Sequence, residues 1–192
     1  MHKIIKIEPV TKFFSITWML GSFCNYDCSY CPAEFHDNTS RPYDLETLKT
    51  AWNNIYQKTQ HLGLKYKISF TGGEVTANKN FLPFLEWLRN NYTEVAWASL
   101  TTNGSASTNY YTKLVNVVES ISFSTHSEFM NEEEFFDKAV RINAVMIRPH
   151  KSFHVNIMDE SWNADGVTRY KSFLDRHKVS YTVNEIFYAN KI

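Results

Sequence analysis

The sequence predicts an α/β fold built on a mainly parallel sheet. Segments typical of β-strands alternate with segments of helical periodicity in about six steps, the last without its helix. Each helix supplies the crossover that parallel pairing of consecutive strands requires. The 192 residues contain no linker rich in Pro, Gly or Ser, and 43% of them are apolar, so one domain over 1–192 with a sizeable core is expected.

The first half of the chain carries three strand–helix steps. An apolar strand at 15–19 leads into a loop, and a helix begins near Pro42 or Asp44. The next strand, at 67–70, precedes a helix for which Asn80 is the expected N-cap. A third strand covers 95–100, and the apolar spacing after it, from Tyr111 onward, indicates another helix.

The second half continues the alternation. A strand at 121–124 is followed by an N-x-x-E pattern at 131–134, which is typical of a capping box at the start of a helix. A strand at 153–157, a helix around 167–174 and a last strand at 180–186 complete the predicted order.

Chemically unusual residues follow each of the first four strands. They are a cysteine loop at 24–31, Gly72-Gly73-Glu74, Thr102-Asn103-Gly104 and Thr125-His126. In parallel sheets the ligand site lies at the carboxyl ends of the strands. The four segments are therefore expected to converge on one site.

Three cysteines, Cys24, Cys28 and Cys31, fall within eight residues, and the chain has no other. An odd number cannot pair fully, which argues against a disulfide-stapled secreted fold. The C-x3-C-x2-C spacing on one loop lets the three thiolates reach one metal centre.

Two metal chemistries compete for this loop. A four-iron cluster held by three cysteines leaves one iron open to a ligand that is not protein. The alternative is a zinc-binding interaction module, in which His36 completes a Cys3His site and the metal braces the loop for partner binding. A structural zinc stabilises small folds that lack a core, and this chain has core without it, so iron–sulfur is favoured.

The charge balance narrows the choice of partners. Twenty basic and twenty acidic side chains give no net charge, so neither nucleic-acid binding nor an anionic membrane surface is expected. The amino terminus, MHKIIKIEPV, has no signal-peptide pattern, and no apolar run is long enough to cross a bilayer. A cytoplasmic location is expected.

The segments FCNYDCSYCP and SFTGGE together resemble the radical S-adenosylmethionine (SAM) enzymes. The signature of that family is C-x3-C-x-aromatic-C after the first strand, where Tyr30 is the aromatic residue, and a Gly-Gly-Glu-type turn after the second. The resemblance covers the chain from Ser15 to Ile186 and implies a partial (βα)6 TIM-like barrel.

The resemblance also implies the cofactors and their site. Cys24, Cys28 and Cys31 would bind three irons of a [4Fe-4S] cluster, and SAM would chelate the fourth. Glu74 or a nearby carbonyl would receive the SAM ammonium, the glycines before it would allow close approach, and Tyr30 would pack near the adenine. The full set expected around SAM is Tyr30, Gly72, Gly73, Glu74, Asn103, Ser124, His126, Asn156 and Ile186.

The reaction implied is reductive cleavage of SAM to methionine and a 5′-deoxyadenosyl radical, which abstracts hydrogen from a substrate; no residue is assigned to the later steps. An external low-potential electron donor, such as flavodoxin or ferredoxin, is implied. With no spare cysteine, no auxiliary cluster is expected.

The sequence stops soon after the sixth strand, so one side of the barrel is expected to be open. A bulky substrate (a peptide, protein or glycan) or a partner such as a second copy in a homodimer is expected to close it. The small size also resembles the glycyl-radical enzyme activases, which act on a large partner protein, and this is the alternative within the family.

Overall fold

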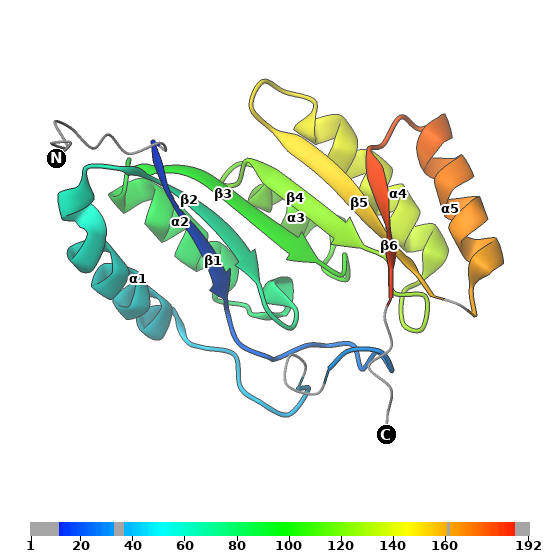
Figure 1. The fold of residues 1–192 in the computed structure, drawn as a ribbon, viewed down its shortest axis with the longest axis horizontal. Helices are drawn as coiled ribbons and strands as arrows, with labels where there is room; N and C mark the ends of the chain where they lie inside the picture. The colour runs from blue at the N-terminus through cyan, green and yellow to red at the C-terminus, as the bar shows by residue number, and fades with distance from the viewer. Residues whose placement is uncertain (1–11, 33–36, 161, 187–192) are drawn as a thin grey trace, which may run out of the picture.

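The computed structural model describes residues 12–32, 37–160 and 162–186. Six strands form one sheet in the order β1-β2-β3-β4-β5-β6, and every neighbouring pair is parallel (Figure 1). The strands are β1 (Phe13–Met19), β2 (Lys65–Thr71), β3 (Val95–Thr102), β4 (Ser120–Ser124), β5 (Ser152–Asp159) and β6 (Tyr181–Glu185). The helices are α1 (Leu45–Thr59), α2 (Phe81–Asn91), α3 (Thr108–Leu114), α4 (Glu132–Met146) and α5 (Ala164–Arg176), with 3-10 turns η1 (Gln60–Leu62) and η2 (Val75–Ala77).

The predicted alternation of strands and helices is confirmed, and local capping explains several boundaries. The side chain of Asp44 accepts a hydrogen bond from the Thr47 N–H and so begins α1. Asn131 caps α4 in the same way, through the Glu134 N–H. Asn80 does precede α2, but its side chain makes no capping bond. The apolar spacing from Tyr111 onward predicts a longer helix than the structure contains, since α3 already ends at Leu114.

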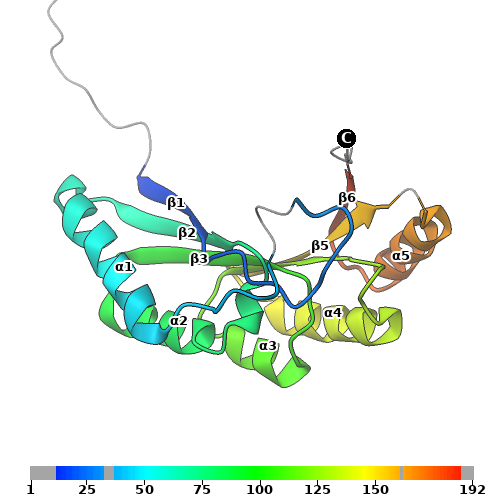
Figure 2. The ribbon, with the colours of Figure 1, turned by 90° about the horizontal axis from the view of Figure 1, so that it is seen from below.

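The helices cover one side of the curved sheet, and in the described residues the other side carries none (Figure 2). Alternate strand residues therefore have different surroundings. Those on the helix side, such as Ile68, Leu100 and Phe123, are fully or almost fully buried in one continuous core. The core provides the rigid platform on which the strand ends are held.

The sheet is open, as expected of a partial barrel. β1 and β6 each pair with one neighbour, and four of the five residues of β6 are exposed. Among the described residues, no helix has the length and apolar character needed to cross a membrane.

The two faces of β4 should respond differently to mutation. Phe123 is fully buried against the rings of Tyr111, Phe135 and Phe153. Phe123→Ala removes these contacts and leaves a cavity, so the free energy of unfolding should fall by about 3–5 kcal/mol in urea denaturation. Ser122→Ala, one residue away on the other face, is the control and should change it by less than about 0.5 kcal/mol. Equal effects would contradict the assignment of the faces.

Candidate functional site

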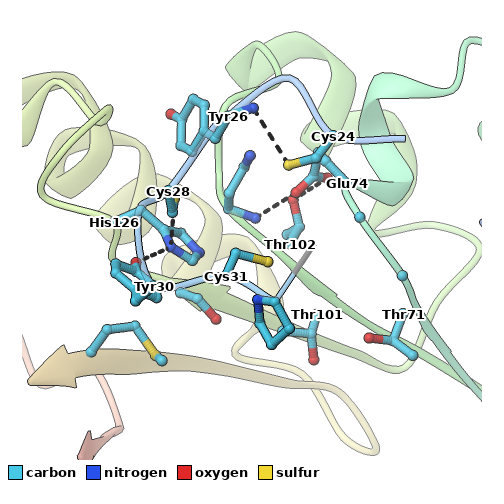
Figure 3. Close-up of a pocket in the computed structure, with 16 residues that line it drawn as sticks. Cys24, Tyr26, Cys28, Tyr30, Cys31, Thr71, Glu74, Thr101, Thr102 and His126 are labelled. Carbon is cyan, nitrogen blue, oxygen red and sulfur yellow. Dashed lines mark hydrogen bonds between the residues drawn. The ribbon is translucent and has the colours of Figure 1, made fainter. Parts of the chain in front are cut away.

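A cavity of about 320 Å³ lies at the carboxyl ends of the first five strands (Figure 3). It is bordered by the cysteine loop, by the segments that follow β2, β3 and β4, and by the end of β5. The lining residues are Cys24, Tyr26, Cys28, Tyr30, Cys31, Pro32, Thr71, Gly72, Gly73, Glu74, Thr101, Thr102, Asn103, Ser124, His126 and Met158. The four segments expected to converge do so here.

The first part of the cysteine loop is held by backbone hydrogen bonds to the end of β2. The Leu20 N–H donates to the Thr71 carbonyl at 2.9 Å, the Gly73 N–H donates to Gly21 at 2.9 Å, and the Glu74 N–H donates to Phe23 at 2.7 Å. These bonds continue the β1–β2 pairing past the strands themselves. They fix the loop up to the residue before Cys24.

Gly72 and Gly73 are required for this contact. A Cβ atom built on Gly73 would lie 2.2 Å from the Phe23 carbonyl oxygen, and one on Gly72 would lie 2.5 Å from that of Gly21. Gly72 also has a φ of 137°, which L side chains rarely adopt. The missing side chains thus make room for the cysteine loop, a reason that differs from the expected approach to a ligand.

Glu74 joins the end of β2 to the end of β3. Its side chain is almost completely buried, and Oε1 accepts from the Thr76 N–H at 2.8 Å and from the Thr102 hydroxyl at 2.7 Å. Oε2 accepts from the Asn103 N–H at 2.6 Å. Burial raises the pKa of Glu74, while these hydrogen bonds act in the opposite direction. The carboxylate therefore positions two of the lining segments.

The second part of the cysteine loop is held by the segment after β4. The backbone and hydroxyl of Ser29 both donate to Glu128, at 2.7 and 2.5 Å. The Tyr30 hydroxyl lies 2.5 Å from Nδ1 of His126 and 3.1 Å from Oε1 of the buried Glu160, to which it donates. The loop is thus attached on both sides of the cavity that it covers.

The three cysteines are free thiols that line the same cavity. Cys28 is buried, with Sγ 3.6 Å from Nδ1 of His126, and the Sγ of Cys24 accepts from the Tyr26 N–H at 3.4 Å (Figure 3). Burial raises the pKa of all three thiols, to about 12 for Cys28, so metal binding would release their protons. In the described part of the chain, no three Cys, His, Asp or Glu side chains gather closely enough to hold a single metal ion.

Most of the expected site residues meet at the cavity, and two do not. Asn156 does not line the cavity, and its amide donates to the hydroxyl of the lining residue Ser124 at 3.3 Å, while Ile186 follows β6 without lining the cavity. His36, the proposed fourth zinc ligand, lies outside the described residues.

Five lining residues lie beyond those expected from the sequence. Tyr26 and Pro32 belong to the cysteine motif, and Thr71 and Thr101 lie at the ends of strands beside the expected turns. A wider window around each motif could have included these four. Met158 lies near the end of β5, where no sequence pattern marks it.

Comparison with known proteins agrees with this geometry. The family model of the radical SAM superfamily matches residues 18–149, a range that contains the three cysteines and the Gly-Gly-Glu turn. A GTP 3′,8-cyclase of Pasteurella multocida is 31% identical over 94 residues, which are 48% of this chain and 27% of that protein.

Solved structures share the fold. SuiB of Streptococcus suis, bound to the precursor peptide SuiA, matches with a TM-score of 0.66 at 15% identity, over 90% of this chain and 39% of SuiB. Native anSMEcpe with bound AdoMet matches with a TM-score of 0.64 at 17% identity, over 91% of this chain and 52% of that one. The chain therefore spans about a quarter to a half of the length of these proteins.

Glu74→Gln tests the role of the buried carboxylate. The new amide group would face a backbone N–H at either position, that of Thr76 or that of Asn103, and leave one buried donor unpaired. The free energy of unfolding in urea should fall by about 1–3 kcal/mol. Glu86→Gln, on the exposed side of α2, is the matched control and should be neutral. Wild-type stability in Glu74→Gln would contradict the bridging role.

Gly73→Ala tests the contact between the β2 turn and the cysteine loop. The added methyl group would overlap the Phe23 carbonyl, so the loop should shift and stability should fall by about 1–3 kcal/mol. The measurement is the rate at which the metal-free protein reacts with a thiol reagent, which should rise as the buried Cys28 is uncovered. Gly63→Ala strains the backbone locally, because Gly63 has a φ of 63°, but its methyl group meets no atom within 4 Å, so this control should leave the rate unchanged. An unchanged rate in Gly73→Ala would show that the turn does not hold the loop.

Proposed function

The chain belongs to the radical SAM superfamily, and on that premise we propose that it cleaves S-adenosylmethionine reductively to start hydrogen abstraction from a bulky substrate. The observation that carries the proposal is the backbone pairing of the cysteine loop with the Gly-Gly-Glu turn over one cavity. This arrangement joins three thiols and the backbone of the Gly-Gly-Glu turn around one cavity.

The three thiols fit a polynuclear cluster better than a single ion. One zinc ion needs its ligands at a single point, whereas each iron of a four-iron cluster takes its own cysteine. Cys24, Cys28 and Cys31 border the cavity without converging on one point, which agrees with a [4Fe-4S] cluster and disfavours the zinc alternative. When bound together, the cluster and SAM would supply one electron to break a sulfur–carbon bond and release methionine and a 5′-deoxyadenosyl radical.

The charge of the cavity suits a cationic ligand. Its lining contains one carboxylate, Glu74, and no lysine or arginine. SAM carries a sulfonium and an ammonium against one carboxylate, so its net charge is positive and the field of Glu74 attracts it. The oxygens of Glu74 already accept hydrogen bonds from three residues. The ammonium group of SAM would therefore donate to the backbone carbonyls of the turn that contains Glu74.

The remaining lining residues are proposed to orient SAM. Tyr30 presents its ring to the cavity while its hydroxyl is held by His126 and Glu160. Asn103 and Ser124 offer an amide and a hydroxyl from the ends of β3 and β4. Polar groups held in this way by other residues lose little freedom on binding, which favours one orientation of the ligand.

The partners proposed follow from this chemistry. A low-potential donor such as flavodoxin or ferredoxin would supply the electron, and the cytoplasm is the compartment that keeps the three thiols reduced. The substrate is proposed to be a peptide, protein or glycan that covers the open side of the sheet, a position that a second copy of the chain could also take. Action on a glycyl-radical partner enzyme is the alternative within the same chemistry.

Cys28→Ala tests the assignment of the cluster. The wild-type protein, reconstituted with iron and sulfide without oxygen, should be brown and form 5′-deoxyadenosine from SAM under dithionite. Loss of one of three cysteine ligands should abolish both the iron–sulfur absorption and the product. The control His61→Ala, an exposed residue on η1, should retain both. A colourless wild-type protein with one stoichiometric zinc, or full cleavage by Cys28→Ala, would contradict the proposal.

A further inference from the structure

The side of the sheet that carries no helix has an unusual composition. Its inward positions alternate with the buried core positions along every strand. On β4 all three of these positions are serine, at 120, 122 and 124. We define the hydroxyl face as the inward positions of the six strands, namely Phe13, Ser15, Thr17, Met19, Lys65, Lys67, Ser69, Thr71, Trp97, Ser99, Thr101, Ser120, Ser122, Ser124, Ser152, His154, Asn156, Met158, Thr182 and Asn184.

One row of hydroxyl groups crosses five strands in register. Thr17 pairs with Ser69, Ser69 with Ser99, Ser99 with Ser120, and Ser120 with Ser152. The Oγ atoms of Ser69 and Ser99 are 3.0 Å apart, and those of Ser120 and Ser152 are 2.8 Å apart. Residues paired in register point to the same side of the sheet, so the row forms a continuous polar strip.

This face is not packed as the interior of a barrel is. The interior of a closed (βα)8 barrel is filled with Val, Ile and Leu. The hydroxyl face contains none of these residues, and Thr17, Ser69, Thr101 and Ser152 are exposed. A folded chain gains little by arranging so many hydroxyl groups on a concave side, because they add no apolar burial. Their arrangement is better explained by a ligand.

The hydroxyl face is continuous with the cavity. Four residues belong to both the face and the cavity lining, and each lies at or next to the carboxyl end of its strand: Thr71, Thr101, Ser124 and Met158. A ligand lying on the face would therefore reach the place where the cysteines stand. The opposite end of the face holds Phe13 and Trp97, whose ring centroids lie 4.2 and 5.7 Å from Nζ of Lys67.

The chemistry of the face indicates the class of ligand. Each Ser or Thr hydroxyl can donate one hydrogen bond and accept two, and it rotates to suit its partner. Sugar hydroxyl groups offer the same pairing, and a half-buried Trp97 can cover the apolar side of a sugar ring. Resting on the function proposed above, we propose that the hydroxyl face binds a neutral carbohydrate chain and brings one of its sugar units to the cavity.

Other polymers fit this face less well. A peptide that binds a sheet as an added strand needs a strand edge and pockets for its side chains, whereas the hydroxyl face is the flat side of a sheet and carries mostly small side chains. Nucleic acids and sulfated glycans need several cations along their length, and the face provides two, Lys65 and Lys67, both in the first half of β2. A neutral carbohydrate requires neither.

Calorimetric titration of the reconstituted protein with SAM present tests the proposal. The probes are cellohexaose, maltohexaose and chitohexaose, with a neutral Gly/Ser hexapeptide and a heparin hexasaccharide as competing classes. Ser99→Ala/Ser122→Ala removes two hydroxyl groups from the middle of the face and should weaken sugar binding about fivefold or more. Ser122→Leu, a second variant, adds bulk at the same place and should weaken it further. Ser172→Ala, exposed on α5, is the matched control and should leave binding unchanged.

Each outcome decides the matter. Binding of at least one neutral sugar that both face variants weaken and the control does not supports the proposal. It is overturned if none of the three sugars binds at millimolar concentration, if the face variants bind as well as wild type, or if the peptide or heparin binds instead. Formation of 5′-deoxyadenosine by the wild-type protein is measured separately, so cleavage without sugar binding rejects this inference alone. Sugar binding without cleavage rejects the proposed function.

Discussion

The contact between the β2 turn and the cysteine loop is the constraint on which the site depends. Two glycines let carbonyl oxygens of the loop approach to distances at which a Cβ atom could not fit, and backbone hydrogen bonds then fix the loop. Glu74, the next residue, ties the same turn to the end of β3 through a buried carboxylate. One short segment therefore positions the thiols and a second wall of the cavity together.

The far side of the loop is held differently, by side chains. Ser29 donates to Glu128, and Tyr30 lies between His126 and the buried Glu160. Because the attachments stand on opposite sides of the cavity, the loop spans it instead of folding away from it (Figure 3). Backbone pairing on one side and side-chain bonds on the other keep the three thiols around one cavity. Within the described residues, no three Cys, His, Asp or Glu side chains come close enough together to hold a single metal ion.

A site residue could be predicted from the sequence where it stands in a short motif, and not where its role depends on a partner far away in the chain. The cysteine spacing, the Gly-Gly-Glu turn and His126 stand in short motifs at strand ends, and topology alone brings strand ends together. Asn156 and Ile186 were assigned by position on a strand, and the geometry leaves both outside the cavity lining. Glu128 and Glu160 carry no local pattern, because their partners, Ser29 and Tyr30, are 99 and 130 residues away in the chain.

The sequence by itself determined the order of strands and helices along the chain, the family and the position of the cysteine loop, because periodicity, caps and motif spacing are local properties of the chain. The period-two alternation of SISFS already separates a core face from a polar face. Only the tertiary structure places that polar face next to the cavity, and only the tertiary structure makes the two glycines necessary. Strand register sets the hydroxyl groups of five strands in one row, and the crossing of two backbones makes the glycine hydrogens necessary. Both the strand register and the close approach of the two backbones arise only when the chain folds.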